Sequence, residues 1–482
     1  MRRRDFLKSS ALGAASCAMF GALGAVRAAG SGRKPNVVFI LADDLGYAEV
    51  GCYGQKKIKT PHIDRLAAEG MRLTQAYSGN PVCAPSRCTL MTGLHTGHAQ
   101  VRGNKQVGGK AGWELGSTIG GQWPIAEDTY TVAKMFKQAG YATGAFGKWG
   151  LGRVGTSGDP QKQGFDHFFG YICQRQAHTY YPNHLWKDGE VFRIEENKDG
   201  KERVYSHDLI ADAALEFVRA NKDRPFFLYV PFTIPHVALQ VPDDSLAQYR
   251  GKWPDAPYDG KKGYIPHAHP RACYAGMVTR MDKDVGRIVA LLDELRLDEN
   301  TLVIFSSDNG PTYAGGADSA FFESAGPLRG LKGSVWEGGI RVPFIARWPG
   351  RIEPGSENDH VTAFWDFLPT CAELLGRRPP DDIDGVSMLP TLLGNDARQK
   401  QHEHLYWELR GQQAVRKGDW KAVRLKPGQK IQLFDLRIDM GEQNDLAAQR
   451  PEIVAQMERI FAHGRTPSEA FPLPKPRQEK AS

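Results

Sequence analysis

The 482-residue sequence lacks several patterns that would assign it to a common class of protein. None of its seven cysteines forms a Cys-x-x-Cys pair, which argues against a zinc ribbon or a dithiol redox motif. It has no internal repeat and no low-complexity tract, so neither a solenoid nor a disordered scaffold is expected. With 41% hydrophobic and 24% charged residues, the composition is that of an ordinary globular protein with one large and one smaller domain.

A strong charge imbalance is also missing once the N-terminus is set apart. Segment 1–28 contains five basic residues and one acidic residue, so it accounts for +4 of the formal net charge of +7. The +3 that remains on the rest of the chain gives no indication of a nucleic-acid partner.

Segment 1–28 has the pattern of a twin-arginine signal peptide. A double arginine, an apolar stretch at 11–26 and a small-residue cleavage site near Ala28 follow one another. We therefore expect export by the twin-arginine machinery to a bacterial periplasm or beyond. The stretch is too weakly hydrophobic for a stable membrane span, although Cys17 leaves a lipoprotein anchor open. Because substrates of this machinery cross the membrane folded, one disulfide or none is expected among the other six cysteines.

Continuous apolar runs alternate with helical patterns over most of the chain. Runs at 36–42, 225–230 and 301–305 are typical of central strands that are covered on both faces. Helical patterns occupy the stretches between them, and 271–295 has the periodicity of one long amphipathic helix. The alternation predicts an α/β fold with a large, mostly parallel central sheet sandwiched by helices.

The pattern changes after residue 375. Short, half-polar strands are expected within 402–436, separated by glycine turns and followed by a helix at 451–462. We therefore predict a catalytic domain at 34–375, a smaller C-terminal antiparallel sheet at 376–466 and a loose tail at 467–482.

Acidic side chains follow two of the predicted strands. Asp43 and Asp44 come directly after the first strand, and Asp308 and Asn309 follow the strand at 301–305. Since ligands of open α/β sheets bind beyond the carboxyl ends of the strands, these groups are expected to converge there. Three carboxylates and an amide form an all-oxygen site, better suited to Ca²⁺ than to zinc. The alternative is that the first pair caps a helix and the second makes a turn.

The most informative segment is Cys83-Ala84-Pro85-Ser86-Arg87, followed by Leu90, Thr92 and Gly93. By this motif the chain resembles the sulfatases, a family within the alkaline-phosphatase superfamily. The resemblance implies an alkaline-phosphatase-like fold and oxidation of Cys83 to formylglycine by a formylglycine-generating maturation enzyme. The hydrated aldehyde is a geminal diol, of which one hydroxyl can bind the metal ion and attack sulfur. A buried structural cysteine or a disulfide partner is the alternative reading of Cys83.

Four further residues are implicated in the chemistry. Two lysines resemble the sulfatase lysines that hold sulfate oxygens. They are Lys148, in Gly-Lys-Trp-Gly-Leu-Gly, and Lys332, in Gly-Leu-Lys-Gly-Ser-Val-Trp-Glu-Gly-Gly. His236, in Thr-Ile-Pro-His, matches a block whose histidine protonates the leaving oxygen. Arg87 lies one turn from Cys83 if a helix starts after Pro85, and its guanidinium can stabilise the ionised diol and bridge to the metal-site carboxylates.

One position departs from the family pattern. Many sulfatases have Lys-Trp-His-Leu-Gly, whereas this chain has Gly150 in place of the histidine that is credited with deprotonating the second diol hydroxyl. His178 is a candidate replacement or a substrate contact.

Together, these expectations predict a calcium-dependent sulfatase that hydrolyses sulfate monoesters to an alcohol and sulfate. The expected substrate is a sulfated glycan or a small sulfate ester. Two alternatives remain open from the residues. One is a phosphonate monoester or phosphate diester hydrolase of the same superfamily, and the other is an exported calcium- or glycan-binding protein without turnover.

Overall fold

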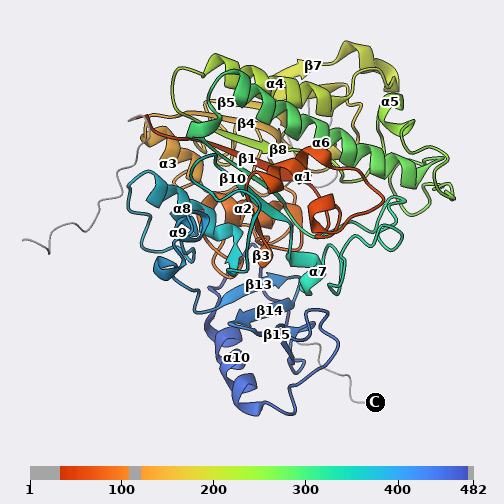
Figure 1. The fold of residues 1–482 in the computed structure, drawn as a ribbon. Coiled ribbons are helices and arrows are strands. Elements are labelled where there is room, and N and C mark those ends of the chain that lie inside the picture. The colour runs from red at the N-terminus through yellow and green to blue at the C-terminus, as the bar shows by residue number, and fades with distance from the viewer. Residues whose placement is uncertain (1–32, 108–120, 476–482) are drawn as a thin grey trace, which may run out of the picture. The chain divides into compact units, whose positions relative to one another are not determined.

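A large mixed sheet organises the chain in the computed structural model, which describes residues 33–107 and 121–475 (Figure 1). The predicted signal peptide at 1–28, with Cys17, and the last residues of the predicted tail lie outside the described residues. The ten strands are, in spatial order, β11 (Ser356–Asn358), β2 (Met71–Leu73), β10 (Phe344–Arg347), β9 (Thr301–Ser307), β1 (Asn36–Ala42), β8 (Phe226–Pro231), β4 (Ala142–Lys148), β5 (His167–Tyr171), β6 (His184–Lys187) and β7 (Glu190–Arg193). The run from β9 to β5 is parallel throughout, and antiparallel neighbours occur only outside it among the described strands. The prediction of a mostly parallel sheet is confirmed.

Strand β1 can lie at the centre of the sheet because its side chains are apolar, except for that of Asn36, which forms hydrogen bonds to neighbouring strands. It runs parallel to β8 on one side and to β9 on the other, with Val38 opposite Leu228 and Val303. All seven of its residues are buried, and alternate side chains enter two different hydrophobic cores. A continuous apolar run is therefore required here, in contrast to the alternating pattern of a strand with one wet face.

Helices cover both faces of the sheet, and each face has its own core. One core contains residues of α1 (Pro61–Ala68), α4 (Ser206–Ala220) and α6 (Pro270–Glu294). The other contains residues of α2 (Cys83–Thr92), α3 (Val132–Gln138) and α8 (Phe367–Leu374). Further short elements include the helices α5 (Asp243–Leu246), α7 (Glu337–Ile340) and α9 (Leu389–Leu392) and the paired strands β3 (Ala76–Tyr77) and β12 (Thr362–Ala363). The long helix predicted at 271–295 is α6.

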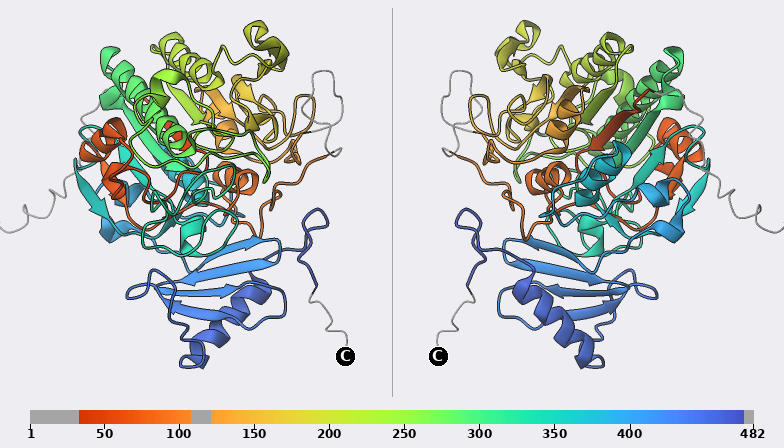
Figure 2. Two further views of the ribbon diagram at one scale, coloured as in Figure 1. Left: turned by 90° about the vertical axis from the view of Figure 1, so that its right-hand side faces the viewer. Right: turned by 90° about the vertical axis from the view of Figure 1, so that its left-hand side faces the viewer.

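A separate antiparallel sheet follows, as predicted from the glycine turns. It consists of β13 (Leu405–Leu409), β14 (Gln412–Lys417), β15 (Trp420–Arg424) and β16 (Gln432–Asp435), with α10 (Pro451–His463) across one face (Figure 2). The opposite face carries Trp407, which packs in one cluster with Tyr77 and Trp365 of the preceding part of the chain. The boundary at 375/376 between two domains stays a prediction.

Two chemical features of the described residues bear on the expectations above. Within 33–107 and 121–475, no helix combines the length and the apolar character that crossing a bilayer requires. The six cysteines of this part of the chain are all free thiols, and five of them are buried.

Candidate active site

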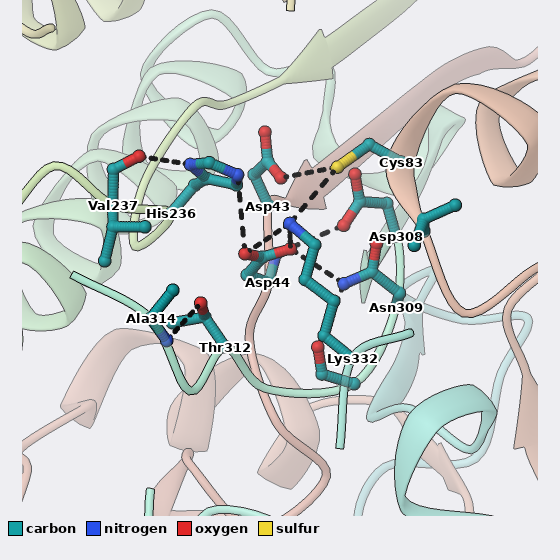
Figure 3. A network of polar contacts seen from close by, with 12 residues as sticks. Asp43, Asp44, Cys83, His236, Val237, Asp308, Asn309, Thr312, Ala314 and Lys332 are labelled. Carbon is teal, nitrogen blue, oxygen red and sulfur yellow. Dashed lines mark hydrogen bonds and ion pairs between the residues drawn. The ribbon is translucent and has the colours of Figure 1, made fainter. Parts of the chain in front are cut away.

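The carboxyl ends of β1 and β9 bring the two predicted acidic pairs together (Figure 3). Asp43, Asp44, Asp308 and Asn309 are fully buried. The Asp44 backbone N–H donates to Asp308 Oδ1 over 3.1 Å, and Asn309 Nδ2 donates to Asp44 Oδ1 over 2.8 Å. Asp44 adopts a φ of 66°, a left-handed conformation that turns the chain sharply after β1 and that aspartate tolerates better than most residues.

Cys83 lies at the first position of α2, so the expected helix start after Pro85 is wrong. Pro85 falls within the first turn, where its missing N–H removes no helical hydrogen bond. The Cys83 thiol donates to Asp43 Oδ1 at 3.4 Å, and Lys332 Nζ lies 3.7 Å from its Sγ. Burial, together with the charge of Asp43, raises the pKa of this thiol to about 12. Unmodified Cys83 is therefore a neutral thiol and a poor nucleophile at neutral pH.

Arg87 connects the two acidic pairs from the same helix. Its Nε and Nη2 donate to Asp308 Oδ2 at 3.1 and 2.8 Å, and Nη2 lies 3.3 Å from Asp43 Oδ2. Its Nη1 donates to the backbone carbonyl of Lys148 over 2.5 Å. The Arg87 side chain is only 1% exposed, so the surrounding residues hold it in one orientation.

Two lysines reach the same centre from distant segments. Lys148, at the end of β4, donates from Nζ to Asp43 Oδ2 over 2.5 Å. Lys332 Nζ donates to Asp44 Oδ2 over 2.7 Å and also faces Cys83, as Figure 3 shows. Both ammonium groups therefore border the space directly in front of position 83.

His236 and His178 lie side by side at the entrance to this centre. His236 Nε2 is 3.6 Å from Asp44 Oδ2, and its Nδ1 hydrogen-bonds the Val237 carbonyl. The His178 ring stacks on His236 with centroids 5.0 Å apart. Burial lowers the pKa of His178 to about 2 and holds that of His236 well below its usual value, helped by the nearby positive charge of Lys332.

The carboxylates have the electrostatics of a site that attracts a cation. Burial raises the pKa of Asp308 to about 6, and the neighbouring charge of Asp43 acts in the same direction. Burial also raises the pKa of Asp44. For Asp43 burial acts in the same sense, but Lys148 and the other cations outweigh it and lower the pKa. The Oδ1 atom of Asn309 is buried and has no hydrogen-bond partner within 33–107 and 121–475. These oxygen donors fit a hard cation such as Ca²⁺.

The centre opens into a pocket of about 480 Å³. His178, His236 and Lys332, all singled out from the sequence, line it. Its other lining residues are Val82, Asn104, Gln106, Gln122, Gln174, Arg175, Tyr264, Thr312, Tyr313, Ala314, Gly333 and Arg410. Gln174 and Arg175 belong to the same short segment as His178, which could have indicated them, whereas no signal in the sequence connects Arg410 with the site.

The structure also shows what adjoins Gly150. A Cβ built at this glycine would lie 2.6 Å from Nε2 of Gln174, so the Gln174 side chain fills the space that a larger residue at 150 would need. Gln174 is 5% exposed and its Nε2 has no partner among the described residues. Gly150 has a φ of 83°, a conformation that favours glycine.

Buried carboxylates, two lysines and an arginine meet at this edge of the sheet, an arrangement that can bind a cation and an anionic ester side by side. A family model described as Sulfatase matches residues 35–377, and one described as N-sulphoglucosamine sulphohydrolase, C-terminal, matches 332–465. Human arylsulfatase A is 34% identical over 424 residues, covering 81% of this chain and 75% of that protein. The chain belongs to the sulfatase family, in the alkaline-phosphatase superfamily.

Two further relatives are similar over nearly the whole length. The N-acetylgalactosamine-6-O-sulfatase of Bacteroides thetaiotaomicron is 29% identical over 517 residues, covering 90% of this chain and 94% of that protein. A crystal structure of Ps i-CgsB in complex with k-i-k-neocarrahexaose superposes with a TM-score of 0.73 at 29% identity, covering 89% and 92% of the two chains. The chain is thus a sulfuric ester hydrolase.

Proposed function

We propose that this sulfatase is an exported, calcium-dependent enzyme that removes sulfate from glycans by means of a formylglycine made from Cys83. The observation that carries the proposal is the environment of Cys83. Its thiol lies between Asp43 and Lys332, beside the predicted metal ligands, yet its pKa of about 12 leaves it neutral. A cysteine at this place becomes useful for hydrolysis only after chemical conversion.

Asp43, Asp44, Asp308 and Asn309 are the residues that would hold the calcium ion, with position 83 as a further ligand after its modification. When bound, the ion supplies positive charge that lowers the pKa of the attacking hydroxyl and offsets the charge of the sulfate. The raised pKa values of Asp44 and Asp308 support this assignment, as does the Oδ1 of Asn309, which no described residue contacts by a hydrogen bond.

Each of the other residues around position 83 has its own proposed role in the reaction. Formylglycine, as its hydrate, supplies the hydroxyl that attacks sulfur. Lys148 and Lys332 border the space where the sulfate oxygens must lie, and they can neutralise charge that builds up there. Arg87 holds Asp43 and Asp308 in place. His236 faces this space from the pocket side and can donate a proton to the departing oxygen, since an anionic substrate raises the pKa of an adjacent histidine.

His178 lies behind His236 in the stack and lines the pocket, which favours the role of a substrate contact over that of a base. Its pKa of about 2 makes it an uncharged hydrogen-bonding group across the physiological range.

A glycan is the proposed substrate because the pocket is polar and because two similar proteins are named for sugars. Amide side chains can donate hydrogen bonds to the hydroxyl groups of a sugar and accept hydrogen bonds from them. Four such side chains line the pocket, those of Asn104, Gln106, Gln122 and Gln174. The names of the Bacteroides thetaiotaomicron relative and of the carrahexaose complex agree with this choice.

The modification is tested first on the tryptic peptide Leu73–Arg87 of the protein purified from its native host. Conversion of Cys83 to formylglycine lowers the peptide mass by about 18 Da. A peptide that is entirely in the cysteine form would refute the proposed nucleophile and favour a binding protein without turnover.

Activity is tested by sulfate release from sulfated mono- and disaccharides, with nitrophenyl sulfate and a matching phosphonate monoester alongside. Cys83→Ala should abolish turnover while the near-UV circular dichroism spectrum stays unchanged. Faster hydrolysis of the phosphonate than of every sulfate ester would overturn the assignment of the substrate. Such a result would establish the alternative hydrolase.

A further inference from the structure

Among the described residues that line the active-site pocket, the charged side chains are all positive. Arg175, Lys332 and Arg410 line it together with amide, hydroxyl and histidine side chains, and no carboxylate is among the described lining residues. Lys332 is paired with Asp44 inside the reaction centre. The outer wall therefore carries two positive charges that the reaction centre does not use.

These two arginines have no partner in the described part of the chain. Neither Arg175 nor Arg410 takes part in an ion pair or a side-chain hydrogen bond there. Other arginines close to the pocket are satisfied, since Arg87 is paired with Asp308 and Arg102 with Glu408. A guanidinium that has no partner among the described residues and lies on the wall of a concave site is a ready binding group for an anion.

The backbone at Arg410 indicates that its side chain serves a purpose other than making the turn. Arg410 and Gly411 connect β13 to β14, and both have positive φ angles, 50° and 91°. Two-residue hairpin turns of this kind favour Asn-Gly because both central residues need a positive φ, which residues other than glycine, asparagine and aspartate rarely adopt. Gln412, the next residue, donates to the Gly333 carbonyl over 2.9 Å, which fixes the tip of the hairpin beside the Lys332 loop. The second sheet thus holds an arginine in an unfavourable conformation at the mouth of the pocket.

We infer that Arg175 and Arg410 form a subsite for a second anionic group, a sulfate or a carboxylate, on the same glycan that carries the sulfate to be cleaved. The inference rests on the proposed function and narrows it from glycans to polyanionic glycans. A pocket of about 480 Å³ has room for a sugar that bears both groups.

The test compares three disaccharides that share one scissile sulfate on the same sugar position. One has no other charge, one has a second sulfate, and one has a uronic acid next to the sulfated sugar. The wild-type enzyme should show a kcat/KM at least tenfold higher for one or both doubly charged substrates, mainly through a lower KM, and the preference should shrink as ionic strength rises. The better of the two identifies the anionic group as sulfate or carboxylate.

Arg175→Gln and Arg410→Asn should each reduce this preference about tenfold. Arg410→Asn is informative because asparagine suits the left-handed turn, so its melting temperature should equal or exceed that of the wild type while the preference falls. Arg219→Gln makes the same change of charge on the exposed surface of α4 and should leave the preference as it is. Arg410→Lys, which keeps the positive charge, should retain part of the preference for the doubly charged substrates.

Two results would count against the subsite in different ways. Equal kcat/KM for all three disaccharides, or a preference that both variants retain, would overturn the inference and leave the glycan sulfatase standing. Hydrolysis of nitrophenyl sulfate without hydrolysis of any disaccharide would overturn the proposed glycan substrate and the subsite with it.

Discussion

Replacing Arg87 by methionine tests whether the buried ionic centre holds this edge of the sheet together. The substitution keeps most of the apolar stem but leaves Asp308 and the Lys148 carbonyl without their guanidinium partner. Each hydrogen bond to a charged group contributes about 1.5–3 kcal/mol, and breaking a buried ion pair typically costs about 3–5 kcal/mol in total. We expect Arg87→Met to lower the free energy of unfolding by about 3–5 kcal/mol, a large part of the stability of most domains.

Equilibrium unfolding in urea, followed by tryptophan fluorescence, measures this loss. It should be largest in EDTA and smaller in calcium, because a bound ion compensates the carboxylates that the guanidinium no longer neutralises. Arg378→Met is the matched control, since Arg378 pairs with Asp381 at the surface and is 83% exposed, and it should cost less than about 1 kcal/mol. If Arg87→Met costs no more than this control in EDTA, Arg87 does not support the centre as described.

The remaining predictions concern catalysis, the metal ion and pH. His236→Ala should slow the hydrolysis of sugar sulfates about 10²-fold or more and that of nitrophenyl sulfate far less, because nitrophenolate leaves without a proton; equal losses would exclude His236 as the acid. Calcium should raise the melting temperature of the wild type but not of Asp308→Ala, and an equal rise in both would place the ion elsewhere. His402 hydrogen-bonds Asp366 at 2.8 and 2.9 Å; burial alone lowers its pKa, but this pairing more than offsets that effect and raises it. Because a raised histidine pKa stabilises the fold below about pH 6.5 and the effect fades as pH rises through the folded pKa, His402→Asn should lower the melting temperature more at pH 6 than at pH 9.

The convergence of the candidate site residues could be predicted from the sequence because these residues lie in short, strongly patterned blocks. Asp43 and Asp44 directly follow an apolar run that has to be a central strand, and the carboxyl end of such a strand fixes where they point. The same reasoning located Asp308 and Asn309 after β9. What these blocks do not specify is the roles of the residues, and those stay predictions.

Elements whose stability comes from their neighbours were harder to predict. Strand β4 has the sequence Ala-Thr-Gly-Ala-Phe-Gly-Lys, and two glycines in seven residues are unfavourable for an isolated strand. It forms because β8 and β5 pair with it on both sides. Gly147 is needed because a Cβ there would lie 1.9 Å from the Pro231 carbonyl oxygen of β8, and Gly170 of β5 is needed because a Cβ there would lie 2.0 Å from the Gly147 carbonyl oxygen. The expected strand start at 402 is also wrong, since His402 is held by Asp366 and β13 begins at Leu405.

Arg410 shows the limit of reasoning along the chain. It reaches the pocket only because the second sheet packs against Tyr77 and Trp365 and because Gln412 bonds to Gly333. Neither contact leaves a periodicity or a motif in the sequence.

The 1% exposure of Cys83 has a consequence for the order of events in the life of the protein. If Cys83 is converted to formylglycine as proposed, an oxidising enzyme could not bring its active site to a thiol buried this deeply, so it would have to act on a chain that has not yet folded. Lys332, which closes over the thiol, comes 249 residues later in the chain. At about 5–20 residues per second, synthesis of that length takes on the order of 10–50 s. Maturation would therefore fall within this interval on the ribosome or soon after it, ahead of folding and ahead of any export pathway that carries folded proteins.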